Sequence, residues 1–133
     1  MTIPDDVERF LLERVETFEQ LESLLALWRL RDRKCSIDDV VSGSKMRENA
    51  VAIALAELTE AGLVEKYLEA GLEYYRLSRT SLSEDLLERL RRAYDDDTLE
   101  VMKLMTSNAM QRLRSAAIRT FSEAFVLRRK KGG

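Results

Sequence analysis

The chain has 133 residues, of which 45% are apolar and 35% charged, with one proline and five glycines. These values fit a single domain with one core, and they exclude a disordered chain and a turn-rich β-sandwich. Histidine, the commonest general base and metal ligand, is absent. We therefore expect a mainly helical protein with no catalytic centre, metal site or cofactor.

The sequence gives no sign of membrane insertion or secretion. No apolar run reaches the roughly 18 residues that cross a bilayer, and residues 1–8 are acidic where a signal peptide is basic. We expect a cytoplasmic protein without membrane contact. The net charge of −2 hides a gradient, because residues 1–30 sum to −4, residues 31–80 to −1 and residues 81–133 to +3. The basic end, densest at residues 128–131, is either a solvated terminus or a contact for nucleic acid.

Two helices are expected at the N-terminus. Pro4 followed by two aspartates is a strong helix start, which predicts a first helix over about residues 4–14. Thr17 with Gln20 three residues later resembles a cap for a second helix. Its apolar stripe is formed by Leu21, Leu24, Leu25 and Trp28, which we expect to lie in the core.

A short helix and a turn are expected next. Ser36 with Asp39 three residues on predicts a capped helix that runs through Val41. The sequence Ser-Gly-Ser at residues 42–44 predicts the turn. Cys35 lies beside this helix start and near basic residues, which lower the pKa of a thiol; a redox-sensing thiol and an ordinary half-buried cysteine are both open.

A longer helix over about residues 47–61 follows the turn, and Gly62 stands where a helix ends in left-handed conformation. One face of this helix is apolar and should point into the core, through Val51, Leu55 and Leu58. The outward positions are then approximately Asn49, Ala50, Ile53, Ala54 and Glu57.

Residues 63–77 predict a small β-hairpin, with Leu63–Glu65 as the first strand, a polar loop containing Gly71 and Leu72–Leu77 as the returning strand. Tyr74 and Tyr75 are neighbours on this strand, so one should point into the core and the other toward solvent.

Helix resumes beyond residue 78. Apolar residues recur at three- and four-residue intervals but are interrupted at residues 95–97, three aspartates, so either one long helix or two helices joined there is expected. Consecutive aspartates point in different directions, and a solvated kink is a better interpretation than a cation site. A last helix over about residues 111–129 carries an apolar stripe that needs a partner: Leu113, Ala117, Phe121, Ala124 and Phe125.

Residues 18–78 resemble the winged helix-turn-helix superfamily of bacterial transcription regulators. The resemblance rests on Ser36–Val41, the turn after it, Leu55–Glu65 with its glycine, and the returning strand Tyr74–Leu77. It implies a winged-helix domain with N-terminal helices over residues 1–78. Residues 79–133 would form a C-terminal helical extension with a basic tail, and in regulators of this layout such helices commonly hold a homodimer together.

The resemblance also implies where duplex DNA would be contacted, because the helix over residues 47–61 takes the place of the recognition helix. The expected DNA-binding residues are Lys45, Arg47, Asn49, Lys66 and Arg76. Lys66 and Arg76 have Glu65, Glu69 and Glu73 as neighbours, which would repel phosphates.

Three functions remain open at this point. The leading hypothesis is a non-enzymatic, DNA-binding transcriptional regulator. Its rival is a protein-interaction adaptor that keeps the fold without binding DNA and holds a protein partner through Ile53, Phe121 and Phe125. A third is a sensor with a small molecule between the winged domain and the C-terminal helices. Ile53 covered by the chain's own C-terminal helices is the alternative to an exposed contact.

Overall fold

The computed structural model describes the backbone of residues 3–132 and the side chains of residues 3–114 and 117. Helices and strands follow one another in the order α1 (Asp5–Arg14), α2 (Phe18–Arg29), α3 (Ile37–Ser44), α4 (Glu48–Glu60), β1 (Val64–Glu69), β2 (Leu72–Leu77), α5 (Glu84–Asp96) and α6 (Thr98–Gly132). The expectation of a mainly helical chain with one small hairpin is confirmed.

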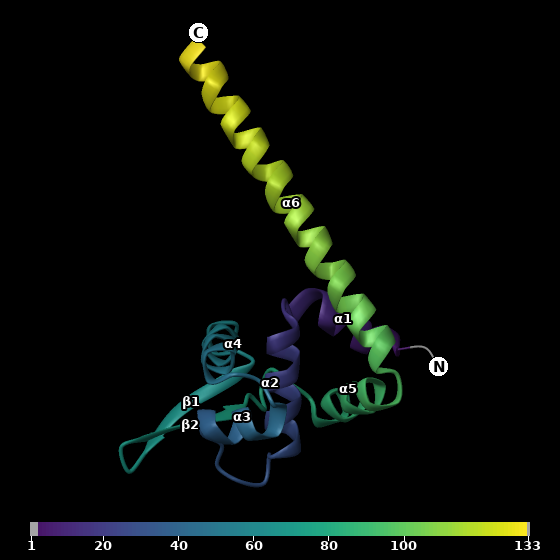
Figure 1. Cartoon of the computed structure of the whole chain (residues 1–133), viewed down its shortest axis with the longest axis vertical. Coiled ribbons are helices and arrows are strands. Elements are labelled where there is room, and N and C mark those ends of the chain that lie inside the picture. The colour runs from purple at the N-terminus through teal and green to yellow at the C-terminus, as the bar shows by residue number, and fades with distance from the viewer. Residues whose placement is uncertain (1–2, 133) are drawn as a thin grey trace.

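Helix α2 is the centre of the molecule. Figure 1 shows α3 and α4 on one side of α2 and α5 on the other, while α6 extends away from the body. The predicted cap is confirmed, since the Thr17 hydroxyl accepts a hydrogen bond from the Gln20 amide at 3.1 Å. The predicted stripe of α2 is fully buried at Leu21, Leu24 and Leu25 and nearly so at Trp28.

Helix α3 is longer than predicted. Its capping box is present, because the Ser36 hydroxyl accepts from the Asp39 amide while the Asp39 carboxylate accepts from the Ser36 amide. The predicted turn at residues 42–44 is wrong, since α3 continues to Ser44 and ends at Lys45, which has a left-handed φ of 61°. Gly43 lies inside the helix, where a Cβ would stand 3.5 Å from a Leu30 methyl group, an ordinary van der Waals distance, so neither a turn nor a close approach requires glycine at this position.

Helix α4 ends as the sequence predicts. Gly62 has a φ of +80°, its amide bonds to the carbonyl of Thr59 and the next amide, of Leu63, bonds to the carbonyl of Leu58. This pair of bonds is the Schellman motif, which satisfies the last carbonyls of a helix through a residue that tolerates positive φ. The chain then enters β1 with Leu63 and Val64 buried.

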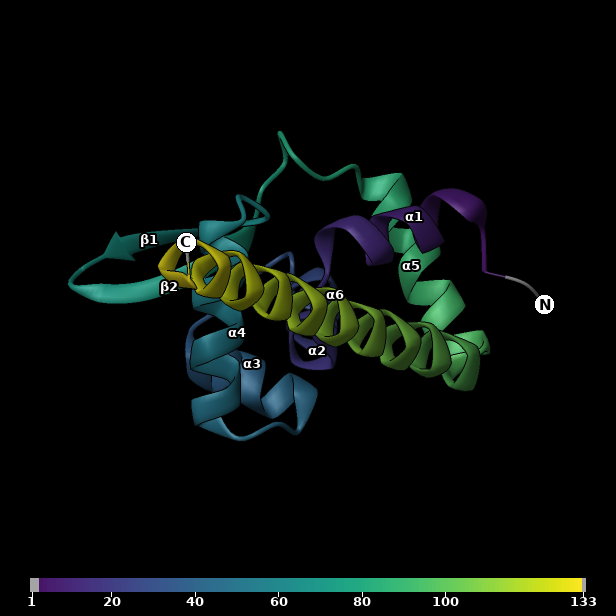
Figure 2. The same cartoon turned by 90° about the horizontal axis from the view of Figure 1, so that it is seen from above.

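Strands β1 and β2 form an antiparallel hairpin that projects from the body in both views (Figures 1 and 2). The register pairs Val64 with Leu77 and Glu69 with Leu72, so the first strand is longer and the loop shorter than predicted, while the returning strand has the predicted bounds. Cys35 adds a short bridge outside β2, because the Tyr75 amide donates to its carbonyl at 2.8 Å. Tyr75 is the tyrosine that points into the core.

Helices α5 and α6 meet at Asp97, which confirms two helices joined within residues 95–97. The expectation of a separate last helix over residues 111–129 is wrong, because α6 is continuous from Thr98 to Gly132. No glycine or proline stands between Thr98 and Lys131 to interrupt it. The side chains of Phe121, Ala124 and Phe125 lie outside the described residues.

One hydrophobic core joins the two parts of the chain. Leu87 and Leu90 of α5 and Val101 and Met105 of α6 belong to the same buried cluster as the core residues of α2 and α4. The boundary at residue 78 therefore separates elements that share a core, and the division into 1–78 and 79–133 stays a prediction. None of the helices in the described part of the chain combines the length and apolarity that a bilayer crossing requires.

Candidate nucleic-acid interface

The start of α4 carries two exposed basic residues. Lys45 ends α3 in left-handed conformation, and Arg47 is the extended residue before α4. Both are exposed, and neither makes an ion pair with any side chain of residues 3–114. The positive end of the α4 dipole adds to their charge, so this corner of the molecule attracts anions. Asn49, in the first turn of α4, is also exposed.

The outward face of α4 is apolar and acidic. Ile53 is 56% exposed, which excludes cover by the described part of the C-terminal helices. Glu57 is exposed as expected, but the prediction for Ala54 is wrong, since its side chain is fully buried. Ala54 stands three residues after Val51 and four before Leu58, and this spacing places it on the buried stripe. Within α4 there are three glutamates and no basic residue.

The two basic residues of the hairpin are held by carboxylates of the hairpin itself. The Lys66 ammonium lies 3.1 Å from Glu73, which raises the pKa of the lysine, and the Arg76 guanidinium lies 3.0 Å from Glu65. Arg76 also stacks on the Tyr67 ring, 4.7 Å from its centroid.

The register further separates these two side chains. Lys66 pairs with Tyr75 and Arg76 with Glu65, so the two basic residues lie on opposite faces of the hairpin. Of the five predicted DNA-binding residues, the structure groups Lys45, Arg47 and Asn49 at one helix end, while Lys66 and Arg76 do not share a face.

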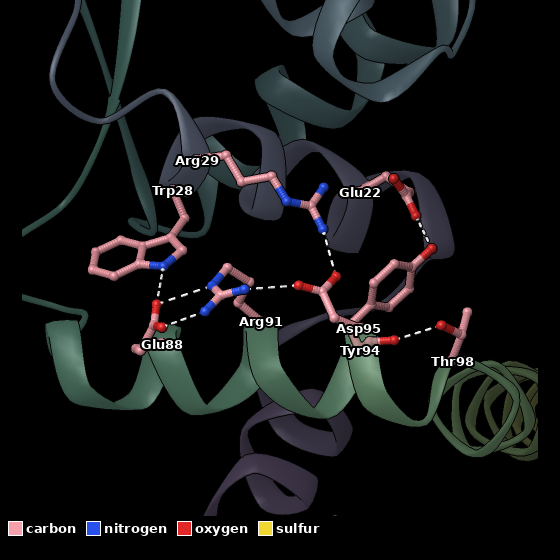
Figure 3. A network of polar contacts seen from close by, with 8 residues as sticks. All are labelled: Glu22, Trp28, Arg29, Glu88, Arg91, Tyr94, Asp95 and Thr98. Carbon is pink, nitrogen blue, oxygen red and sulfur yellow. Dashed lines mark hydrogen bonds and ion pairs between the residues drawn. The ribbon is translucent and has the colours of Figure 1, made fainter.

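A polar network holds α5 against α2 (Figure 3). The Trp28 indole donates to Glu88 at 3.0 Å, and Arg91 bonds both Glu88 and Asp95, which in turn pairs with Arg29. The hydrogen bond from Arg91, followed by that from Trp28, lowers the pKa of Glu88 to about 2. Because α2 also packs on α4, this network fixes the position of α4 relative to the C-terminal helices.

The Tyr94 hydroxyl donates to Glu22 at the other end of the same interface, and burial raises its pKa to about 12. The tyrosine backbone carbonyl accepts a hydrogen bond from Thr98, the first residue of α6. The sequence patterns did not reveal this network, since its acids and bases are divided between α2 and α5 and are brought together only by packing.

Cys35 is 2% exposed, and burial raises the pKa of its thiol; the nearby Asp39 raises it further, and the opposing effect of Arg33 is smaller. Arg33 does lower this pKa, but burial and Asp39 outweigh it, so the expectation of a lowered thiol pKa is wrong. Arg33 is exposed, and its guanidinium forms an ion pair with the Asp39 carboxylate at 2.9 Å, which offsets its charge.

The chain has the winged-helix fold. It is similar to the *Staphylococcus aureus* transcription regulator MepR, a regulator of the multidrug efflux pump MepA, with 15% identity and a TM-score of 0.54 over 90% of this chain and 87% of that one. A complex of *S. aureus* MepR with DNA aligns at 20% identity and a TM-score of 0.53, over 82% of this chain and 87% of that one.

A MarR family transcription regulator aligns at 21% identity and a TM-score of 0.51, over 90% of this chain and 80% of that one. No protein-family model matches the sequence, and no curated protein does. The likeness is thus one of fold: it confirms the expected winged helix-turn-helix fold, and it extends beyond residues 18–78 into the C-terminal helices.

Proposed function

We propose that this protein is a transcription regulator that binds double-stranded DNA through the start of α4. The observation that carries the proposal is the exposed pair Lys45 and Arg47, free of carboxylate contacts in residues 3–114, at the positive end of the helix that follows α3. The fold supports it, because MepR, which aligns with this chain at a TM-score of 0.53, forms a complex with DNA.

In this proposal α4 enters the major groove with its first turn toward the bases. Lys45 and Arg47 neutralise phosphates beside the groove, and the Asn49 amide is the side chain able to make two hydrogen bonds to an adenine. Lys66 and Arg76 of the hairpin contribute less, since each must leave or share its glutamate to reach a phosphate.

The proposed regulator is a homodimer held by α6. Val101 and Met105 use one side of this helix to pack in the core, yet a second apolar stripe stays exposed at Leu99, Met102, Met110 and Leu113. Leu99 and Met110 are 11 residues apart, as are Met102 and Leu113, and this spacing is about three helical turns, so the stripe follows one face. A second copy of α6 would cover this stripe; the side chains of Phe121 and Phe125, also predicted to bind a partner, lie outside the described residues.

The test is binding of a labelled duplex of about 30 base pairs with random sequence, followed at low salt by fluorescence anisotropy. Arg47→Glu should abolish binding, because it replaces a phosphate contact by a repulsive charge. Arg9→Glu, an equal charge change at an exposed position of α1, is the matched control and should bind more strongly than Arg47→Glu. Equal affinities for the two variants would remove α4 from the interface.

A protein-interaction adaptor is the second candidate, favoured by one observation. The outward face of α4 has an isoleucine that is 56% exposed and no basic residue, which suits contact with a protein better than contact with a phosphate backbone. Ile53→Asp should then release a partner that co-purifies in the presence of nuclease. Retention of the wild-type protein on DNA at low salt, with no such partner, decides for the regulator.

A further inference from the structure

The connection between α3 and α4 contains a glycine and a left-handed residue in two different places. Lys45 ends α3 with a φ of 61°, in the left-handed region that favours glycine. Gly43 lies two residues earlier, inside the helix, where glycine is less favourable than any residue except proline. No close contact requires the glycine there, because a Cβ would meet Leu30 and Ala26 at 3.5 and 3.7 Å. Each of the two residues is therefore in a conformation that suits it poorly.

The same chain ends α4 in the favourable way. Gly62 has the left-handed conformation, and the amides of Gly62 and Leu63 bond to carbonyls of the last helical turn. If α3 ended on its own glycine in this manner, the helix would stop two residues earlier and Lys45 would not need a positive φ. The sequence thus encodes two ends for α3, the observed one at Lys45 and a shorter one at Gly43.

Three hydrogen bonds hold the longer form of α3. The Lys45 amide donates to the Val41 carbonyl at 2.9 Å, and the Ser44 hydroxyl donates to the Val40 carbonyl at 2.7 Å. The Ser44 hydroxyl also accepts from the Met46 amide at 3.3 Å. These bonds offset two unfavourable backbone positions, each of which costs about as much as one net hydrogen bond contributes. The two forms are consequently close in free energy.

The difference between the two forms is confined to the turn. Val40, before it, is fully buried, and Met46, after it, packs against the core. Between them Ser42, Gly43 and Lys45 are exposed. The end of α3 can therefore shorten while α3 and α4 keep their places in the core. The residue that changes position is Lys45, whose side chain belongs to the proposed interface.

We propose that α3 exchanges between these two ends and that duplex DNA selects the longer one, a regulation that rests on the proposed function. In the longer form Lys45 and Arg47 are held together at the start of α4. In the shorter form residues 44–47 are a loop without helical bonds, so the two bases have no fixed separation and must be ordered on binding. Affinity is then reduced in proportion to the fraction of molecules in the shorter form.

The first measurement follows the Lys45 amide of the DNA-free protein by NMR-detected hydrogen exchange, because this amide has its Val41 partner only in the longer form. Gly43→Ala favours that form twice, since alanine is a better helical residue than glycine and a poorer left-handed one. It should raise the protection factor of this amide at least about tenfold. Ser42→Ala, at an exposed neighbouring position of α3, is the matched control and should change it less than about threefold. Equal protection in wild type and Gly43→Ala would overturn the proposal.

The second measurement is the affinity of each variant for the random-sequence duplex at low salt. Gly43→Ala keeps every proposed contact residue and should bind at least about threefold more tightly than wild type, whereas Ser42→Ala should bind as wild type does. Unchanged or weaker binding by Gly43→Ala would overturn the selection of the longer form by DNA. If the wild type bound no duplex while the exchange data were as expected, the proposed function would be refuted and the two ends of α3 would stand.

Discussion

The salt dependence of DNA binding offers the sharpest test of the interface, because the structure predicts how many phosphates each protomer neutralises. Lys45 and Arg47 are the exposed bases at α4, while Lys66 and Arg76 are engaged by Glu73 and Glu65. A dimer then makes about four phosphate contacts, and at about 0.9 counterions per contact the logarithm of affinity falls against the logarithm of salt with a slope of about −3.6.

A slope of this size means that raising salt from about 50 to about 200 mM weakens binding on the order of 100-fold. If all four bases reached phosphates, the eight contacts of a dimer would give a slope of about −7 and a loss on the order of 10,000-fold. The two cases are easily distinguished by anisotropy titrations at four or five salt concentrations.

Arg47→Gln should reduce the slope to about −1.8, because one contact is lost from each protomer. Arg76→Gln should leave the slope unchanged, since its charge is already matched by Glu65 across the strands. The reasoning is refuted by a wild-type slope near −7, or by a slope that responds to Arg76→Gln and not to Arg47→Gln.

Three further predictions concern stability, pH and assembly. Gly62→Ala should lower the free energy of unfolding in urea by about 1 to 2 kcal/mol, because the φ of Gly62 is +80°. Gly43→Ala, inside α3 with ordinary contacts to Leu30, should leave this free energy unchanged or raise it by up to about 1 kcal/mol. Equal effects of the two substitutions would contradict this. The pKa of Glu88 is lowered to about 2, so its stabilising contribution is complete above its ordinary pKa and is lost as pH falls toward 2. The thermal midpoints of wild type and Glu88→Gln should therefore differ at pH 7 and converge near pH 2, and a constant difference would be inconsistent with that shift. Leu113→Asp should convert the proposed dimer into a monomer by light scattering at micromolar concentration, while Gln111→Asp, exposed on α6 but about 160° around the helix from Leu113, should not.

Local sequence signals were sufficient where one short segment supplies both the residue and its partner. Ser36 and Asp39 cap α3, Thr17 caps α2 and Gly62 ends α4, each through bonds to backbone groups within four residues. Such contacts are specified by chain order alone, so the starts of α2 and α3 and the end of α4 were predicted to within one residue.

Local signals failed where a distant segment changes what a residue does. Gly43 was predicted to form a turn, but α3 continues through it to Ser44, and the left-handed residue that ends the helix is Lys45. The basic neighbours of Cys35 were expected to lower its thiol pKa, but burial against the hairpin has the larger effect and raises it. The assignment of Ala54 to the surface was wrong because the buried face of α4 is wider than Val51, Leu55 and Leu58 alone suggest.

By itself the sequence determined the order of elements from α1 to β2 and the three candidate groups at the start of α4, because periodicity, caps and chain order are properties of neighbouring residues. Only the tertiary structure decided which charges remain available. Pairing of β1 with β2 sets Glu65 against Arg76, and packing of α5 on α2 gives Trp28 its bond to Glu88. The number of charged residues follows from the sequence, but the electrostatic effect of each one depends on the partners that folding brings within a few ångströms.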